Sequence, residues 1–254
     1  MAEPTSPASL RVHGLTKRFG GVIAGDNLDL DIGPGEFHAL IGPNGAGKTT
    51  TIAQLAGELV QNAGTIHFDG KEISNLSTPQ RVRLGLSRTF QITQTFSDFT
   101  VEESVALAVQ IHQGRFQRLW KNAGRDPALR IPTLRWLNEV GLADRMDRVV
   151  GDLAHGEQRQ LEIAMALASE PRLLMLDEPL AGMGPVESRR MVELMRRLKG
   201  HLTILLVEHD VDAVFELADR VSVLVYGRCI ASGSAEQIRL DPQVREAYLG
   251  ETTT

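Results

Sequence analysis

The residues best suited to chemistry form a glycine-rich stretch, GPNGAGKTT, directly after the apolar run FHALI. Its spacing fits GxxxxGK[ST], in which backbone N–H groups curl around phosphates, a lysine reaches the β and γ phosphates, and a hydroxyl binds Mg²⁺. The helical-looking segment that follows would add the anion attraction of a helix N-terminus. A chance glycine-rich turn is the weaker interpretation, because the motif is complete. We therefore expect a nucleoside triphosphate to bind at Gly42, Pro43, Asn44, Gly45, Ala46, Gly47, Lys48, Thr49 and Thr50.

A second candidate site follows another apolar run. The residues LLML are followed directly by Asp177 and Glu178. Carboxylates at the C-terminal end of a buried strand suit a Mg²⁺ site and a base that activates water. A solvated acidic turn is the weaker alternative, because four apolar residues precede the pair. The two motifs predict a site for a nucleoside triphosphate and Mg²⁺, but kinases, helicases, GTPases and transporters all share them.

Composition narrows the class of protein. A chain of 254 residues, 42% hydrophobic and 23% charged, can bury the core of one large domain or of a domain with an inserted lobe. The net charge of -5 argues against a nucleic-acid partner. The single cysteine, Cys229, excludes an internal disulfide and is expected to be a small buried residue. Without a signal peptide or an apolar span long enough for a bilayer, we expect a soluble chain that can dock on a membrane protein.

The sequence predicts two kinds of strand around these motifs. Alternating apolar and polar residues predict a half-exposed antiparallel sheet at residues 10–19, 26–32 and 64–70. Nearly continuous apolar runs predict parallel strands covered on both faces by helices, at residues 37–42, 172–178, 202–209 and 220–227. The expected fold class is therefore α/β, a P-loop NTPase with a RecA-like mixed sheet core and an antiparallel β subdomain.

Strand signals disappear in the middle of the chain. Residues 101–113 and 128–143 instead show the helical spacing of apolar side chains. We expect one domain over residues 8–250, with an inserted helical subdomain at 92–157 and short tails at 1–7 and 251–254. An amphipathic helix over residues 155–170 should lead back into the sheet.

A third motif makes the prediction more specific. The segment DLAHGEQRQLEIAMALA places Gly156 21 residues before Asp177, which leaves room for one helix and a short turn. Here the chain resembles the nucleotide-binding subunits of ABC transporters, and LAHGEQ resembles their LSGGQ signature. The resemblance implies that the signature contacts the ATP of a partner subunit through Ala154, His155, Gly156, Glu157 and Gln158.

The same resemblance assigns roles to residues between these motifs. Phe19, in KRFGG, matches the aromatic residue that stacks on adenine, although alone it is as readily an ordinary strand-end aromatic. Gln91, in SRTFQ, matches a catalytic glutamine that joins Mg²⁺ to the helical lobe, beside the metal residues Thr49 and Asp177. His209, in LLVEHD, matches the switch histidine that contacts the γ-phosphate, with Glu178 as the base.

Two residues depart from the family pattern. Ala154 stands where the signature usually has serine, which removes a hydroxyl donor to the partner's γ-phosphate. Gly184, in EPLAGMG, stands where the loop after the acidic pair usually has aspartate. Because a homodimer would repeat both departures, the sequence favours a heterodimer with a second ATPase subunit that carries the intact residues.

Within the family, the likeness is to the ATPases of branched-chain amino-acid importers and of related importers for urea and other small solutes. It rests on GPNGAGKTT, SRTFQ, the alanine-containing signature, LLVEHD and the tail EQIRLDPQVREAYLGE. It implies a peripheral subunit at the cytoplasmic face of the cell membrane, with two permease subunits and, indirectly, a solute-binding protein as partners. Phe96 and Phe99 would line the permease groove or fill the core of the helical lobe.

Three other functions stay open at this point. A lipopolysaccharide-export ATPase has a similar tail, although such ATPases usually keep LSGGE, and a soluble ABC ATPase would share every motif. A P-loop kinase is disfavoured, because the spacing of the signature from the acidic pair and the trailing His209 indicate water as the acceptor.

Overall fold

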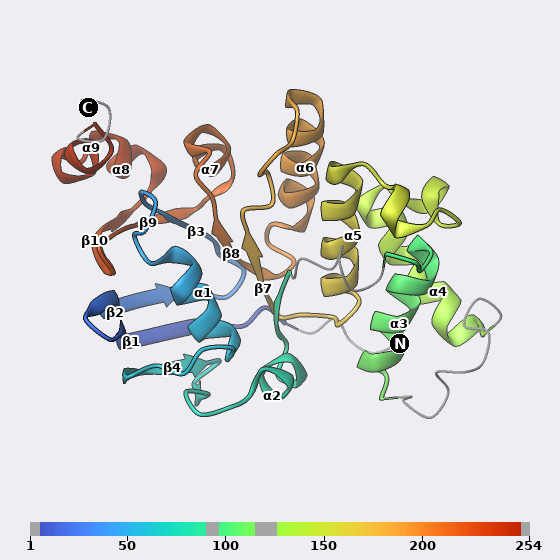
Figure 1. Ribbon diagram of the computed structural model, residues 1–254, viewed down its shortest axis with the longest axis horizontal. Helices are drawn as coiled ribbons and strands as arrows, with labels where there is room; N and C mark the ends of the chain where they lie inside the picture. The colour runs from blue at the N-terminus through green and yellow to red at the C-terminus, as the bar shows by residue number, and fades with distance from the viewer. Residues whose placement is uncertain (1–5, 90–96, 115–125, 250–254) are drawn as a thin grey trace.

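The computed structural model describes residues 6–89, 97–114 and 126–249. The chain folds into two sheets, a layer of helices and a helical lobe (Figure 1). Its strands are β1 (Leu10–Phe19), β2 (Val22–Ile32), β3 (Phe37–Ile41), β4 (Ala63–Phe68), β5 (Lys71–Glu72), β6 (Leu86–Arg88), β7 (Leu173–Asp177), β8 (Thr203–Val207), β9 (Arg220–Val225) and β10 (Arg228–Gly233).

The helices lie between and around these strands. The α-helices are α1 (Lys48–Ala56), α2 (Thr78–Arg83), α3 (Val101–His112), α4 (Pro127–Val140), α5 (His155–Leu167), α6 (Pro185–Leu198), α7 (Val211–Leu217), α8 (Ala235–Leu240) and α9 (Pro242–Leu249). Two 3₁₀ helices, η4 (Ala143–Arg145) and η5 (Val150–Asp152), connect α4 to α5. In the part of the chain that the structure describes, no helix is long and apolar enough to cross a membrane.

The central sheet has the strand order β10-β9-β3-β8-β7-β6. Its strands β9, β3, β8, β7 and β6 are parallel, and β10 is antiparallel to β9. The four long apolar runs form β3, β7, β8 and β9, as the sequence predicts. Neither β6 nor β10 was predicted, because β6 has only three residues and β10 is a polar edge strand.

The second sheet has the order β2-β1-β4-β5 and is antiparallel throughout. Its three long strands include the three alternating segments of the sequence. The helix α1 contacts β2 of this sheet and β6 and β7 of the central sheet, so it lies between the two layers (Figure 1). The helix ends at Ala56, because Gly57 terminates it in the left-handed conformation, with φ 81°.

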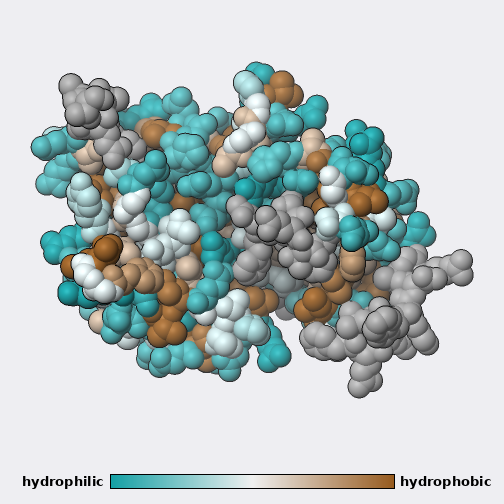
Figure 2. Space-filling view, in the orientation of Figure 1, coloured by the Kyte–Doolittle hydropathy of each residue, from teal (hydrophilic) through white to brown (hydrophobic). Residues whose placement is uncertain are grey.

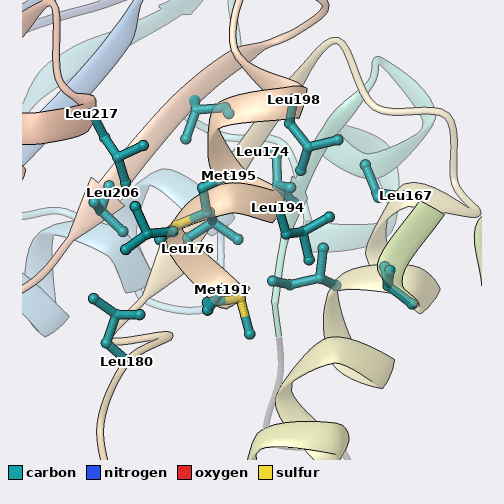
Figure 3. Packing of buried hydrophobic residues seen from close by; sticks show 14 of the residues in the cluster. Leu167, Leu174, Leu176, Leu180, Met191, Leu194, Met195, Leu198, Leu206 and Leu217 are labelled. Atoms are coloured by element: carbon teal, nitrogen blue, oxygen red, sulfur yellow. The ribbon is translucent and has the colours of Figure 1, made fainter. Parts of the chain in front are cut away.

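Alternate residues of the central strands enter two separate cores. Leu174 and Leu176 of β7 face a cluster with α5, α6 and α7, whereas Leu173 and Met175 face α1 and the antiparallel sheet. In Figure 3, Met191, Leu194 and the other labelled side chains of α6 pack against the first face. Burial of both faces fixes the register of each strand, and with it the place where each strand ends.

The middle of the chain is helical where the structure describes it. α3, α4 and α5 contact one another and form a lobe at the end of the molecule opposite α8 and α9 (Figure 1). One isolated antiparallel bridge joins Thr100 to Val149. The boundaries 92 and 157 of the helical subdomain stay a prediction, as do those of the domain.

Candidate nucleotide site

The P-loop connects β3 to α1 and fits tightly against its neighbours. A Cβ added at Gly42 would lie 2.1 Å from the carbonyl oxygen of Leu224, and one added at Gly47 would lie 2.1 Å from that of Ala24. Gly47 is the N-cap of α1, with φ 103° and no side-chain cap. Glycine is therefore required at both positions, and the first turn of α1 keeps its N–H groups for a ligand.

The lysine of the loop folds back over it. Lys48 is buried, and its Nζ donates hydrogen bonds to the carbonyl oxygens of Gly42 at 2.6 Å and Pro43 at 3.1 Å. A phosphate offers an ionised acceptor, which binds an ammonium group more strongly than a neutral carbonyl does. The ammonium group of Lys48 is thus already positioned within the loop that is expected to bind phosphate. Thr49 follows it with an exposed side chain.

The turn between β9 and β10 supports the P-loop from outside. Gly227 N donates to Ala46 O at 2.8 Å, and Asp26 N donates to Gly227 O at 2.9 Å. An ion pair between Arg228 and Asp26 joins the same turn to β2. The sequence did not reveal this support, because the residues are remote in the chain and form no motif.

The predicted adenine residue lies on β1, the partner strand of β2, whose Ala24 lies against Gly47 of the P-loop. Phe19 ends β1 with half of its surface exposed, and Lys17 Nζ lies 5.2 Å from the centre of its ring. With Val22 and Ile23 it forms an exposed apolar edge. In Figure 2 hydrophobic residues gather on this side of an otherwise largely hydrophilic face. The geometry leaves the ring accessible to a base.

The acidic pair lies where the sequence predicts, at the end of β7. Glu178 has φ 47°, which is rare for a residue with a side chain, and its N–H donates to Val207 O at 2.9 Å. Strain of this kind commonly marks functional positions. Asp177 is aligned with Val207 of β8, so the pair lies next to the segment that contains Glu208 and His209.

His209 itself projects outward, with 63% of its side chain exposed. Its position depends on Glu208, which is fully buried. Glu208 Oε1 accepts from Leu180 N at 2.7 Å, and Oε2 accepts from His209 N at 3.0 Å. Burial raises the pKa of Glu208 above the usual carboxyl value, although these backbone N–H groups oppose the shift. Glu208 thereby ties the loop after the acidic pair to the histidine, a role that sequence reasoning missed.

The strand order brings these groups together. β3, β8 and β7 are neighbours and run parallel, so the P-loop, His209 and the acidic pair all follow the C-terminal ends of adjacent strands. Gln91 lies outside the described residues, as does Phe96. The strand β6, three residues upstream of Gln91, pairs with β7.

The signature segment lies apart from the P-loop. α5 contacts α3, α4 and α6, whereas α1 contacts the two sheets, and the two helices lie in different parts of the molecule (Figure 1). Ala154 is the N-cap of α5, and the helix begins with His155 and Gly156. His155 Nε2 lies 3.2 Å from Ala181 O, in the loop after the acidic pair.

Glu157 occupies the first turn of α5. Its carboxylate accepts from Ala154 N and from Arg145 Nε, each at 3.1 Å. Partial burial alone would raise the pKa of Glu157, but the two hydrogen bonds outweigh it, so the pKa lies below the usual value. Gln158 follows Glu157, and its amide lies 3.5 Å from Val150 O.

Two further residues concern the minor expectations. Cys229 is only partly buried, and it lines a surface groove between β2 and β10 together with Asp26, Asn27 and Arg228; the prediction of a buried cysteine was wrong, because β10 is an edge strand. Phe99 is 40% exposed and is not part of the buried core.

Comparison with known proteins identifies the family. The ABC transporter profile matches residues 25–181, from β2 through the acidic pair. The high-affinity branched-chain amino acid transport ATP-binding protein LivG of Escherichia coli K12 is 41% identical over 251 residues, covering 95% of this chain and 98% of the relative. The chain belongs to the ABC transporter family.

Further comparisons agree with this assignment. The high-affinity branched-chain amino acid transport ATP-binding protein BraF of Pseudomonas aeruginosa is 39% identical over 250 residues, covering 95% of this chain and 98% of the relative. A crystal structure of the ADP conformation of an ATP-binding cassette of an ABC transporter has a TM-score of 0.85 and 30% identity, covering 96% of this chain and 99% of that one. The protein is thus a nucleotide-binding ABC ATPase, that is, the transporter subunit that powers transport. Its predicted fold class is confirmed.

Proposed function

We propose that this ABC ATPase hydrolyses ATP with Mg²⁺ at the P-loop and powers the import of branched-chain amino acids or a similar small solute. The observation that supports it most is the convergence of the P-loop, Asp177, Glu178 and His209 at the ends of three adjacent parallel strands. Lys48 and the N–H groups of α1 bind the phosphates, and Glu178 polarises the attacking water. His209 contacts the γ-phosphate, and Phe19 stacks on adenine.

The available donors fit Mg²⁺ bound together with a nucleotide. Among the described residues, no three His, Cys, Asp or Glu side chains could hold a metal by themselves. Mg²⁺ in nucleotide sites is bound by one or two protein oxygens together with phosphate oxygens and water. The Thr49 hydroxyl and the Asp177 carboxylate supply such oxygens, with Gln91 as a third candidate. The metal would neutralise charge on the phosphates.

The catalytic assignment is tested by separating chemistry from binding. Glu178→Gln keeps the shape of the side chain but removes the base, so ATP turnover in the assembled transporter should fall by about 10²-fold or more. The affinity for ATP with Mg²⁺ should stay unchanged in the purified chain. Unchanged turnover would remove Glu178 from this role.

Support for the solute comes from two comparisons. The C-terminal profile of branched-chain amino acid ATP-binding cassette transporters matches residues 228–253, from β10 onward, and LivG and BraF are named for the same transport. Neither comparison favours the lipopolysaccharide exporter or the soluble ATPase. Uptake of radiolabelled leucine by cells with and without the gene would test the proposal; loss of urea uptake alone would redirect it to a related solute.

The proposed assembly has two ATPase subunits on two permease subunits, with a solute-binding protein outside and this chain at the cytoplasmic face. One cassette over residues 8–250, with helices inserted at 92–157, presents its P-loop to the partner's signature. Because α5 and α1 lie in different parts of this chain, a signature can complete the P-loop site only from a second subunit. Ala154 and Gly184 favour a heterodimer, since neither supplies a side-chain donor or acceptor at its helix N-terminus.

A further inference from the structure

One arginine links the acidic site to the helix of the P-loop. Arg88, the last residue of β6, donates from Nη2 to Asp177 Oδ2 at 2.8 Å and from Nη1 to Glu58 Oε2 at 2.5 Å. Asp177 ends β7, and Glu58 lies just beyond the C-terminal end of α1, which begins with Lys48. A single guanidinium is thus shared between a carboxylate of the nucleotide site and one outside it.

The Arg88 guanidinium lies where water screens its charge only partly. The Arg88 side chain is 14% exposed and that of Asp177 is 17% exposed, whereas Glu58 is 31% exposed. Arg88 Nε is buried and has no hydrogen-bond partner among the described residues. Charges partly removed from water are screened less than surface charges. The guanidinium therefore acts on Asp177 as a fixed positive charge.

The backbone holds Arg88 at this place. β6 pairs with β7 in register, with Arg88 opposite Met175, and Thr89 N donates to Met175 O at 3.0 Å. The guanidinium therefore reaches the end of β7 from the neighbouring strand. It binds Oδ2 of Asp177 and leaves the other carboxylate oxygen free of hydrogen bonds from described residues.

We propose that Arg88 sets the Mg²⁺ affinity of the nucleotide site by competing with the metal for the charge of Asp177. Without metal, the guanidinium is shared between Asp177 and Glu58; when Mg²⁺ binds, the pairing shifts toward Glu58. Arg88 is a positioning residue that acts through Asp177, and the inference rests on the proposed role of Asp177 in metal binding.

The arrangement predicts opposite effects on Mg²⁺ affinity for substitutions of Arg88 and of Glu58. In Arg88→Gln, a positive charge near the metal is lost, so Mg²⁺ should bind more tightly, by about tenfold. In Glu58→Gln, the guanidinium loses its second carboxylate and pairs with Asp177 alone, so Mg²⁺ should bind more weakly, by about threefold. Damage to the fold would weaken binding in both variants.

The test titrates Mg²⁺ by calorimetry into the full-length chain saturated with ADP. Arg88→Lys keeps the charge and should stay close to the parent. The matched control is Arg172→Gln, at the opposite end of β7, where Arg172 Nη2 pairs with Asp69 at 2.7 Å; its Mg²⁺ affinity should not change. ADP affinity in EDTA should be the same in all variants, which shows that each is folded.

The outcomes separate this inference from the proposed function. Equal weakening, or no change, in Arg88→Gln and Glu58→Gln would overturn the inference. Asp177→Asn distinguishes the two levels: if it weakens Mg²⁺ binding while the other variants behave like the parent, only the role of Arg88 fails. If Asp177→Asn itself binds Mg²⁺ normally, the proposed metal role of Asp177 fails, and the inference with it.

Discussion

Two helix N-termini in this chain are suited to phosphate, and they differ in how complete they are. α1 begins with Lys48 after its N-cap Gly47, has no acidic residue in its first turn, and buries the Lys48 side chain against the preceding loop. α5 begins after Ala154, has no side-chain cap and carries Glu157 in its first turn. An acidic side chain there stabilises the helix but cancels part of the positive potential that attracts an anion.

The difference between the two helix N-termini indicates what each would contribute to a nucleotide site in the proposed assembly. The P-loop supplies its own cation and lies between two sheets that fix its shape, so it can bind nucleotide within one chain. The signature helix has no side-chain donor at its N-cap, Ala154, and the carboxylate of Glu157 in its first turn is already paired with Arg145. In the proposed assembly, it therefore adds to a site that the partner's P-loop has formed, rather than forming one by itself.

The largest expected effect is on the P-loop side. Lys48→Ala removes a charge-assisted hydrogen bond to phosphate, so the affinity of the purified chain for ATP should fall by about 10²-fold. Fluorescence titration with a labelled nucleotide measures this. His155→Ala on the signature side is the control, and it should leave the affinity of the isolated chain unchanged. Equal losses of ATP affinity in Lys48→Ala and His155→Ala would contradict the difference between the P-loop and the signature.

The next effect concerns the connection between the acidic loop and His209. Glu208→Ala leaves the buried Leu180 N–H without its acceptor, so the free energy of unfolding should fall by about 1–3 kcal/mol, measured by urea denaturation. Glu208→Gln keeps one amide oxygen and should lose less.

The pH dependence of this effect has a definite sign. Because burial raises the pKa of Glu208 in the folded chain, its contribution to stability is greatest below the unfolded carboxyl value of about 4.3 and declines as pH rises through the folded value. The stability advantage of the parent over Glu208→Gln should therefore shrink from acidic to neutral pH. An advantage that grows would contradict the raised pKa.

A smaller effect is expected at the N-cap of α5. Ala154→Ser supplies the missing acceptor for the first turn, which should raise the free energy of unfolding by about 0.5–2 kcal/mol. Thermal denaturation of the isolated chain tests this without a partner. Ala168→Ser, at the other end of α5, is the control and should bring no such gain. A destabilised Ala154→Ser would show that the serine cannot cap this helix.

The smallest effect is at Glu157. Glu157→Gln removes a partly exposed ion pair with Arg145, which contributes less than about 1 kcal/mol. Because the pKa of Glu157 is lowered in the folded chain, the stability it adds is present above the unfolded carboxyl pKa and is lost as pH falls through the folded value. The parent and the variant should therefore converge in acid, as measured by denaturation at several pH values.

Most of the strands, the P-loop and the acidic pair could be predicted from the sequence, because each is marked by a pattern of residues that are neighbours in the chain. The apolar runs of β3, β7, β8 and β9 differ plainly from the alternating patterns of β1, β2 and β4. The P-loop comes directly after β3 in the sequence, and the acidic pair lies at the end of β7. β10 escaped prediction because Cys229 and Ser232 give an edge strand no clear pattern. Arg88 and Glu208 escaped because their partners, Asp177 and Leu180, become neighbours only when parallel strands align.

The central claim is that one chain contains a complete P-loop side and an incomplete signature side. It is tested most directly by the mass in solution of the purified Glu178→Gln chain with ATP and Mg²⁺ at micromolar concentration. We expect one ATP bound per chain and a mass near 27.8 kDa, with tighter ATP-dependent self-association when Ala154→Ser is added. A stable homodimer of the chain without that substitution would contradict the account.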